Sequence, residues 1–78
     1  MKTESYIIKN NLPDGSITPT GVFKRRNAVQ HFINLINYLT INDYKIKTFL
    51  RNERNKPLRG TIRVEVDGFY YYVELIAQ

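Results

Sequence analysis

Apolar residues recur every three or four positions over residues 28–40, which is the spacing of one side of an α-helix. The apolar side of this predicted helix is made of Val29, Phe32, Ile33, Ile36 and Leu39. Asn27 is a favoured N-cap residue, and Gln30 follows three positions later, as in a capping box. The pattern therefore predicts one amphipathic helix that begins after Asn27.

In most of the remaining chain, apolar and polar residues alternate with the period of a β-strand. The predicted strands are residues 4–9, a short edge strand around residues 21–24, and residues 44–51, 61–66 and 69–77. Residues 10–15 are a cluster of turn-forming residues that predicts a loop after the first strand, and Asp67-Gly68 is typical of a two-residue type I′ hairpin. We therefore expect a single α+β domain over residues 1–78, in the order β(β)αβββ, with the helix packed on one face of an antiparallel sheet.

The turn at Asp67-Gly68 determines which hairpin residues lie opposite each other, beginning with Val66 and Phe69. The pleat then separates an apolar face, which the helix is expected to cover, from a second face that stays open. The expected apolar face holds Ile62, Val64, Val66, Phe69, Tyr71, Val73 and Leu75. The expected open face holds Arg63, Glu65, Tyr70, Tyr72, Glu74 and Ile76, together with Lys45, Lys47, Phe49 and Arg51 from residues 44–51.

The open face combines basic and aromatic residues, which suits two kinds of partner. Aromatic rings stack on bases and cations neutralise phosphates, so the predicted nucleic-acid site includes Lys45, Lys47, Phe49, Arg51, Arg63, Tyr70 and Tyr72. The same residues suit a protein interface, because Tyr is favoured in strands and aromatic rings anchor protein partners. Two hypotheses therefore stay open. The partner is DNA or RNA, or it is a host protein on which the chain docks as an inhibitor from a phage or mobile element.

Two further groups of cations extend the predicted nucleic-acid site. Lys24, Arg25 and Arg26 precede the predicted helix, where free N–H groups and basic side chains would together bind a phosphate. The alternative is that these three side chains are simply solvated. The loop before residue 61 adds Arg54, Lys56 and Arg59, although charged loops are commonly just hydrated.

Composition narrows the class of protein further. The formal charge of +5 attracts polyanions without selecting among them, although it also favours solubility. Without cysteine there is no disulfide framework, thiol nucleophile or Cys-rich zinc site, and His31 has no catalytic partner in the sequence. We expect no catalytic residue, no metal and no cofactor, hence no enzyme. With no signal peptide or membrane-length apolar stretch we expect a cytoplasmic protein, and homodimerisation is compatible with so small a core.

Overall fold

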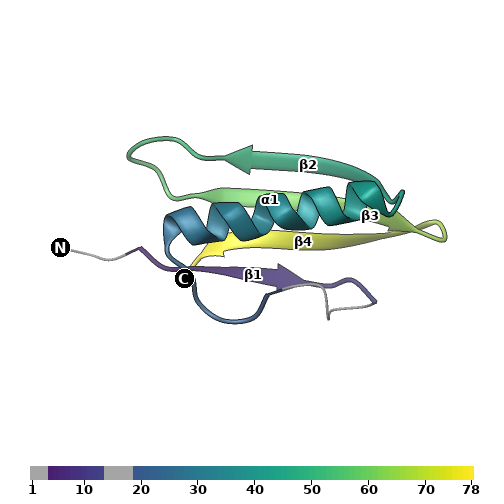
Figure 1. The fold of residues 1–78 in the computed structure, drawn as a ribbon, viewed down its shortest axis with the longest axis horizontal. Helices are drawn as coiled ribbons and strands as arrows, with labels where there is room; N and C mark the ends of the chain where they lie inside the picture. Colours follow the sequence, from purple (N-terminus) through teal and green to yellow (C-terminus); the bar gives the residue numbers. More distant parts are fainter. Residues whose placement is uncertain (1–3, 14–18) are drawn as a thin grey trace.

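The computed structural model describes residues 4–13 and 19–78 as one helix packed against a four-stranded sheet. The elements are β1 (Tyr6–Asn10), α1 (Arg25–Ile41), β2 (Lys45–Arg51), β3 (Arg59–Val66) and β4 (Phe69–Ala77). Every pair of neighbouring strands is antiparallel, in the order β1-β4-β3-β2, so β1 and β2 are the two edges (Figure 1). The predicted α+β fold is confirmed.

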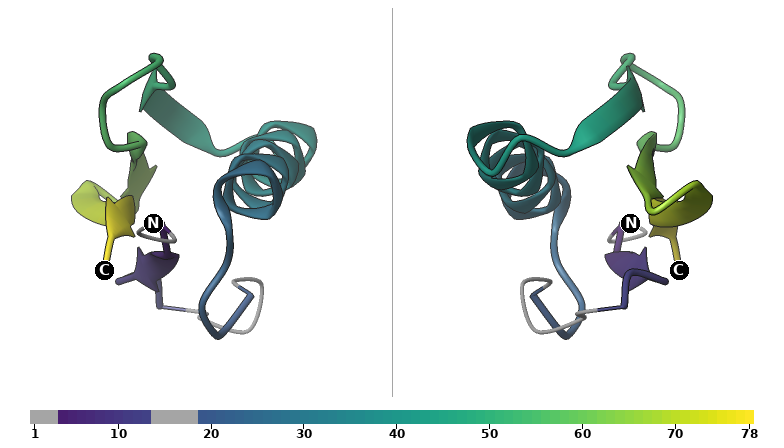
Figure 2. Two further views of the ribbon diagram at one scale, coloured as in Figure 1. Left: turned by 90° about the vertical axis from the view of Figure 1, so that its left-hand side faces the viewer. Right: turned by 90° about the vertical axis from the view of Figure 1, so that its right-hand side faces the viewer.

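The sheet is curved, and α1 lies against its concave side. Seen along the strands, β2, β3, β4 and β1 form an arc with the helix on the inside (Figure 2). No described element lies on the convex side, because a single helix covers only one face of a sheet. The convex side is therefore open, as the sequence predicts.

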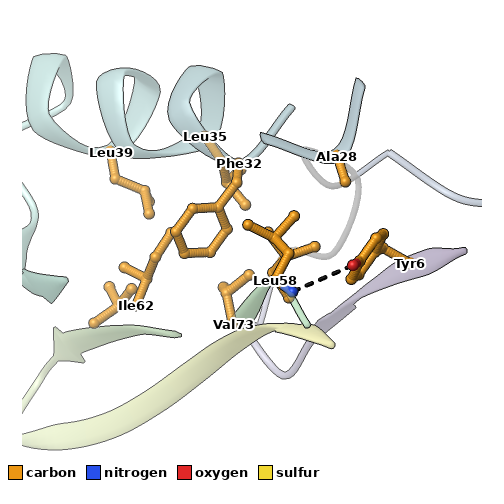
Figure 3. Close-up of a cluster of buried hydrophobic side chains, with 10 residues drawn as sticks. Tyr6, Ala28, Phe32, Leu35, Leu39, Leu58, Ile62 and Val73 are labelled. Carbon is orange, nitrogen blue, oxygen red and sulfur yellow. Dashed lines mark hydrogen bonds between the residues drawn. The ribbon is translucent and has the colours of Figure 1, made fainter. Parts of the chain in front are cut away.

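The core is one layer of side chains between α1 and the sheet (Figure 3). Its buried members are Tyr6, Ala28, Phe32, Leu35, Leu39, Leu58, Ile62, Val64, Val73 and Leu75. The helix contributes residues spaced four, three and four apart, which centres its buried stripe between Phe32 and Leu35. Ile33 lies beyond the edge of that stripe and is 39% exposed, so its predicted place in the apolar face is wrong.

The start of α1 differs from the prediction. The helix begins at Arg25, and the N-cap is Lys24, which has extended backbone and makes no side-chain cap hydrogen bond. Asn27 therefore lies in the first turn, and Gln30 donates to the Asn34 Oδ1 at 3.0 Å instead of reaching back to a cap. The predicted capping box is wrong because hydrogen bonds of the Arg25 side chain to a distant loop favour an earlier start.

A local backbone motif ends α1. The Asp43 N–H donates to the carbonyl of Thr40, and the Tyr44 N–H donates to the carbonyl of Leu39, both at 3.1 Å. Asp43 has a φ of 62°, the left-handed conformation that a Schellman motif requires one residue after the cap. The chain thereby reverses direction into β2, close to the predicted end of the helix.

The β3–β4 hairpin has the predicted turn and register. Asp67 and Gly68 have φ values of 52° and 83°, as a type I′ turn requires, and Val66 lies opposite Phe69. The predicted edge strand around residues 21–24 is reduced to one bridge between Phe23 and Tyr6. The loop predicted after the first strand is confirmed for residues 11–13, which follow the end of β1 at Asn10, and its remaining residues 14 and 15 lie outside the described chain.

Gly60 gives a test of the core. A Cβ atom at this position of β3 would lie 2.7 Å from the Phe32 Cζ, in the middle of the core. We expect Gly60→Ala to lower the free energy of unfolding by about 1–3 kcal/mol, because a buried ring must leave its place. Chemical denaturation measures the change. Phe32→Leu in the same chain should recover part of the loss, and two strictly additive effects would contradict a direct clash.

Candidate functional site

The open face is the convex side of the sheet, made of the outward side chains of its four strands. The registers place in this face Ile7 and Lys9 from β1, Tyr70, Tyr72, Glu74 and Ile76 from β4, Arg59, Thr61, Arg63 and Glu65 from β3, and Lys45, Lys47, Phe49 and Arg51 from β2. All the residues that the sequence assigns to this face lie in it. Sequence reasoning missed Lys9 and Ile7, because it did not place the first strand beside the last.

Positive charge dominates the open face. The four described strands contribute six cations and only two carboxylates to it. Two of the cross-strand pairs between β2 and β3 also place one cation opposite another, Lys47 with Arg63 and Arg51 with Arg59. Like charges that lie directly opposite each other destabilise a sheet, so the fold itself does not favour this arrangement.

Three aromatic rings lie among these cations with about half of their surface exposed. The exposed fractions are 52% for Phe49, 53% for Tyr70 and 45% for Tyr72. The guanidinium of Arg63 lies over the Tyr70 ring, 4.7 Å from its centroid, in a cation–π contact. All three rings are thus accessible to flat ligands, and that of Tyr70 is also held by the Arg63 side chain.

One hollow lies on the open face, and another lies at the end of that face beside the β2–β3 loop. One is a depression of about 70 Å³ lined by Lys45, Ile46, Lys47, Arg63, Glu65 and Tyr70. The other, near the opposite ends of the strands, is a cleft of about 300 Å³ lined by Arg51, Pro57, Leu58, Arg59, Ile76 and Ala77. Both hollows pair cations with apolar or aromatic walls, a combination suited to an anion that also carries a flat or apolar group.

Arg51 belongs in part to the protein's own structure. Its Nη2 donates to the Pro57 carbonyl at 3.0 Å, which holds the start of β3 against the end of β2. Its Nε is buried and has no hydrogen-bond partner in the structure. A buried guanidinium N–H without an acceptor is costly, so an acceptor in the cleft beside it would be favoured.

The helix-start cations are not equivalent, and their predicted place before the first turn is wrong for two of them. Arg25 and Arg26 lie in the first turn of α1, after Lys24. The Arg25 guanidinium donates to Asn52 Oδ1, to the carbonyls of Glu53 and Lys56, to Glu4 Oε2 and to the Tyr6 hydroxyl, over 2.8–3.4 Å. Arg25 is thus occupied in joining the β2–β3 loop to the helix, whereas Lys24 and Arg26 are exposed.

Tyr6 completes this connection from inside the core. Its ring is buried, and its hydroxyl donates to Glu4 Oε2 at 2.8 Å and accepts from the Leu58 N–H at 3.2 Å (Figure 3). Leu58 places its own side chain in the core, so the loop ends in a buried anchor. The residues of this polar cluster were missed from sequence because they are far apart in the chain and have no local pattern.

The loop cations Arg54 and Lys56 lie outside the open face. Both are exposed, and Lys56 pairs with Glu53 at 3.3 Å. Arg59, predicted in the same loop, is instead the first residue of β3 and lies in the open face. The predicted site is therefore divided among the open face, the β2–β3 loop and the helix start.

The described residues contain no group of three or more His, Asp or Glu side chains able to hold a metal ion. His31 is half-buried, and its ring lies 4.5 Å from that of Phe23. Within the described part of the chain, no helix is long and apolar enough to cross a membrane.

Comparison with known proteins identifies no relative. No protein-family model, curated protein or solved structure matches this chain.

Glu4 provides a test of the polar cluster. Hydrogen bonds from the Tyr6 hydroxyl and the Arg25 guanidinium lower the pKa of the Glu4 carboxyl from its ordinary value of 4.5. A lowered pKa in the folded state stabilises the fold above that ordinary value, and the contribution is lost as pH falls through the folded pKa. We expect Glu4→Gln to be less stable than the natural protein near pH 7 and to differ less from it as pH falls below about 4. Thermal unfolding across this pH range measures the difference, and a difference that does not change with pH would contradict the assigned contacts.

Proposed function

We propose that this protein is a small, non-enzymatic module that binds nucleic acid through the open face, with single strands as its preferred form. The observation that carries the proposal is the pairing of like charges across β2 and β3. Lys47 opposite Arg63 and Arg51 opposite Arg59 cost stability in the free protein. A polyanion along the face would reverse that cost, because phosphates between the cations turn repulsion into attraction.

The aromatic rings support a single-stranded ligand. Tyr72 lies directly beside Arg63 in the register, and Phe49 and Tyr70 are on the neighbouring rows. Base stacking on an exposed ring contributes about 1–3 kcal/mol, but only where the bases are not already stacked within a duplex. Flat rings between cations therefore favour unpaired bases over a double helix, whose bases are turned inward.

The open face also has the length that several nucleotides need. From Lys45 to Arg51 the β2 strand extends by six residues, which corresponds to about 20 Å. The two hollows lie toward the ends of this span, one beside Lys45 and one beside Arg51. Phosphates bound near the two hollows would leave the bases between them over the aromatic rings.

The remaining predicted cations have a smaller role in this proposal. Lys24 and Arg26 are exposed but lie at the helix start, away from the open face, and Arg25 is occupied by its loop contacts. Arg54 and Lys56 would add to long-range attraction at one end of the sheet. These side chains therefore provide the comparison for the tests of the open face.

Reversing two charges on the open face tests the electrostatic part. We expect Lys47→Glu with Arg63→Glu to weaken binding of labelled single-stranded DNA or RNA by about tenfold or more, because phosphate contacts become repulsive. Folding should be retained, because one like-charge pair replaces another. Lys47→Glu alone places opposite charges across the strands and should raise the free energy of unfolding by about 0.2–1 kcal/mol while still weakening binding.

The control for these variants is Lys24→Glu with Arg26→Glu, which changes the net charge equally. Anisotropy titrations at about 50 and about 200 mM salt compare the variants, since phosphate contacts give a steep salt dependence. The control should bind nearly as well as the natural protein. Equal weakening in both double variants would assign binding to net charge and contradict the open-face site. Salt-independent capture of a protein, with no nucleic-acid binding, would support the protein-binding hypothesis.

A single ring tests the stacking part. We expect Tyr72→Leu to weaken single-strand binding by about 1–3 kcal/mol without changing the salt slope, because stacking releases no counterions. A Lys47→Gln variant should instead reduce that slope by about 0.7, one phosphate contact on a single strand. Titrations at several salt concentrations separate the two effects. Binding by Tyr72→Leu that equals that of the natural protein would leave only the charges as the source of affinity.

A further inference from the structure

The two edge strands of the sheet differ in how far other segments cover them. Outside β1, Tyr6 and Phe23 exchange two backbone hydrogen bonds of 2.8 Å, so part of this edge is covered. β2 forms the other edge, and no described segment pairs with its outer side (Figure 1). An uncovered edge strand presents N–H and C=O groups that are able to pair with another strand.

The register shows which backbone groups of β2 are available. In a two-residue hairpin the residues beside the turn, Val66 and Phe69, form a hydrogen-bonded pair, and such pairs then alternate along the strands. It follows that Glu65, Arg63 and Thr61 direct their N–H and C=O groups toward β2. The outer side of β2 is consequently left with the N–H and C=O groups of Ile46, Thr48 and Leu50.

Hydrogen bonds at the opposite edge confirm this alternation. Continued across β4 to β1, it predicts that even-numbered β1 residues direct their backbone groups outward and odd-numbered residues direct them toward β4. Tyr6 does bond outward to Phe23, and the Asn11 N–H donates inward to the Tyr72 carbonyl at 3.1 Å. The same alternation therefore applies through the sheet, and the three outward residues of β2 are assigned with it.

The side chains of β2 indicate which residues a strand that pairs with its outer edge would need. On the open face the strand carries Lys45, Lys47 and Arg51, and it contains no acidic residue. On the helix side Ile46 is half-buried and Leu50 is 36% exposed. A complementary strand would alternate acidic residues, opposite the cations, with apolar residues that cover Ile46 and Leu50.

A second copy of this chain does not meet that requirement. Antiparallel pairing of two β2 strands can be centred on Lys47, Thr48 or Phe49 if at least two of the outward residues are to be bonded. Those registers place Lys47 opposite itself, Lys45 opposite Arg51, or Lys47 opposite Arg51. Each register brings two cations together, which disfavours self-association through this edge.

We propose that the outer edge of β2 binds an extended acidic segment of a partner protein as a fifth strand. This inference goes beyond nucleic-acid binding, because its hydrogen bonds come from backbone groups at the edge and not from the open face. The two ligands share the Lys45 and Lys47 side chains. An acidic strand would therefore compete with nucleic acid while it is bound.

The test uses a labelled, end-capped peptide of the length of β2 in which Glu and Val alternate. Its matched control carries N-methyl groups on the Val amides, which would face β2, so the charge is the same but the donors are lost. We expect the unmodified peptide to bind at low salt and the methylated peptide to bind at least about tenfold more weakly. Hydrogen exchange at the amides of Ile46, Thr48 and Leu50 should slow only with the unmodified peptide.

Equal binding of the two peptides, or no binding of either, would overturn the proposal.

Thr48→Pro adds a test on the protein, since it removes an outward N–H that the β2–β3 pairing does not use. This variant should lose the peptide at least about tenfold and still bind single-stranded nucleic acid, whereas Lys47→Glu with Arg63→Glu is the variant that tests nucleic-acid binding. If Thr48→Pro does not fold, the comparison of the unmodified and methylated peptides on the natural protein still tests the proposal. A dimer in sedimentation that Thr48→Pro dissociates would make a second copy the occupant and overturn the acidic partner.

Discussion

One helix for a four-stranded sheet is the constraint on which the rest of this structure depends. α1 covers the concave side, so the buried apolar side chains of the described chain lie in the single layer between helix and sheet. Packing in that layer is close enough that the ring of Phe32 occupies the space of a side chain at Gly60. No element of the described ranges 4–13 and 19–78 covers the convex side, so its side chains remain in contact with water. Long basic side chains suit this exposure, because their stems cover apolar surface while their charges remain hydrated.

A polar cluster fastens the first strand, the helix start and the β2–β3 loop together at one end of the sheet. Arg25 and Tyr6 connect the first strand, the helix and the β2–β3 loop through hydrogen bonds, and Leu58 adds the apolar anchor. Two adjacent arginines of the same sequence motif thus have different physical roles. Arg25 is directed into the loop carbonyls, whereas Arg26 is left in solvent. Cations near one another in sequence are therefore poor guides to a common site.

The open face was predictable from sequence because its pairing is local. A two-residue turn fixes the β3–β4 register. The alternation of apolar and polar residues in β2 then shows which of its side chains share the open face, so Lys47, Arg63 and Tyr72 could be placed together. Lys9 could not be placed, because its partner Glu74 lies near the other end of the chain. The predicted start of the helix was also wrong because it depends on residues that are distant in the sequence. The cap residue Asn27 is a local signal, but the contacts of Arg25 with a loop more than twenty-five residues away outweigh it.

The position of β4 has a consequence for how the chain reaches this fold. β4 is the last strand in sequence, yet it lies inside the sheet between β1 and β3, and Tyr6 pairs with Ala77. During synthesis on a ribosome, β1 has no partner strand in the sheet until β4 has emerged. Its apolar residues Ile7 and Ile8 therefore remain in an unpaired segment until then. The helix and the β2–β3 pair form from nearby residues, but closing the sheet requires a loop of almost the whole domain. Acquisition of the native sheet is therefore a late event that follows translation of β4, and a nascent chain stalled before that point leaves β1 and the β4-facing edge of β3 without their partner strand.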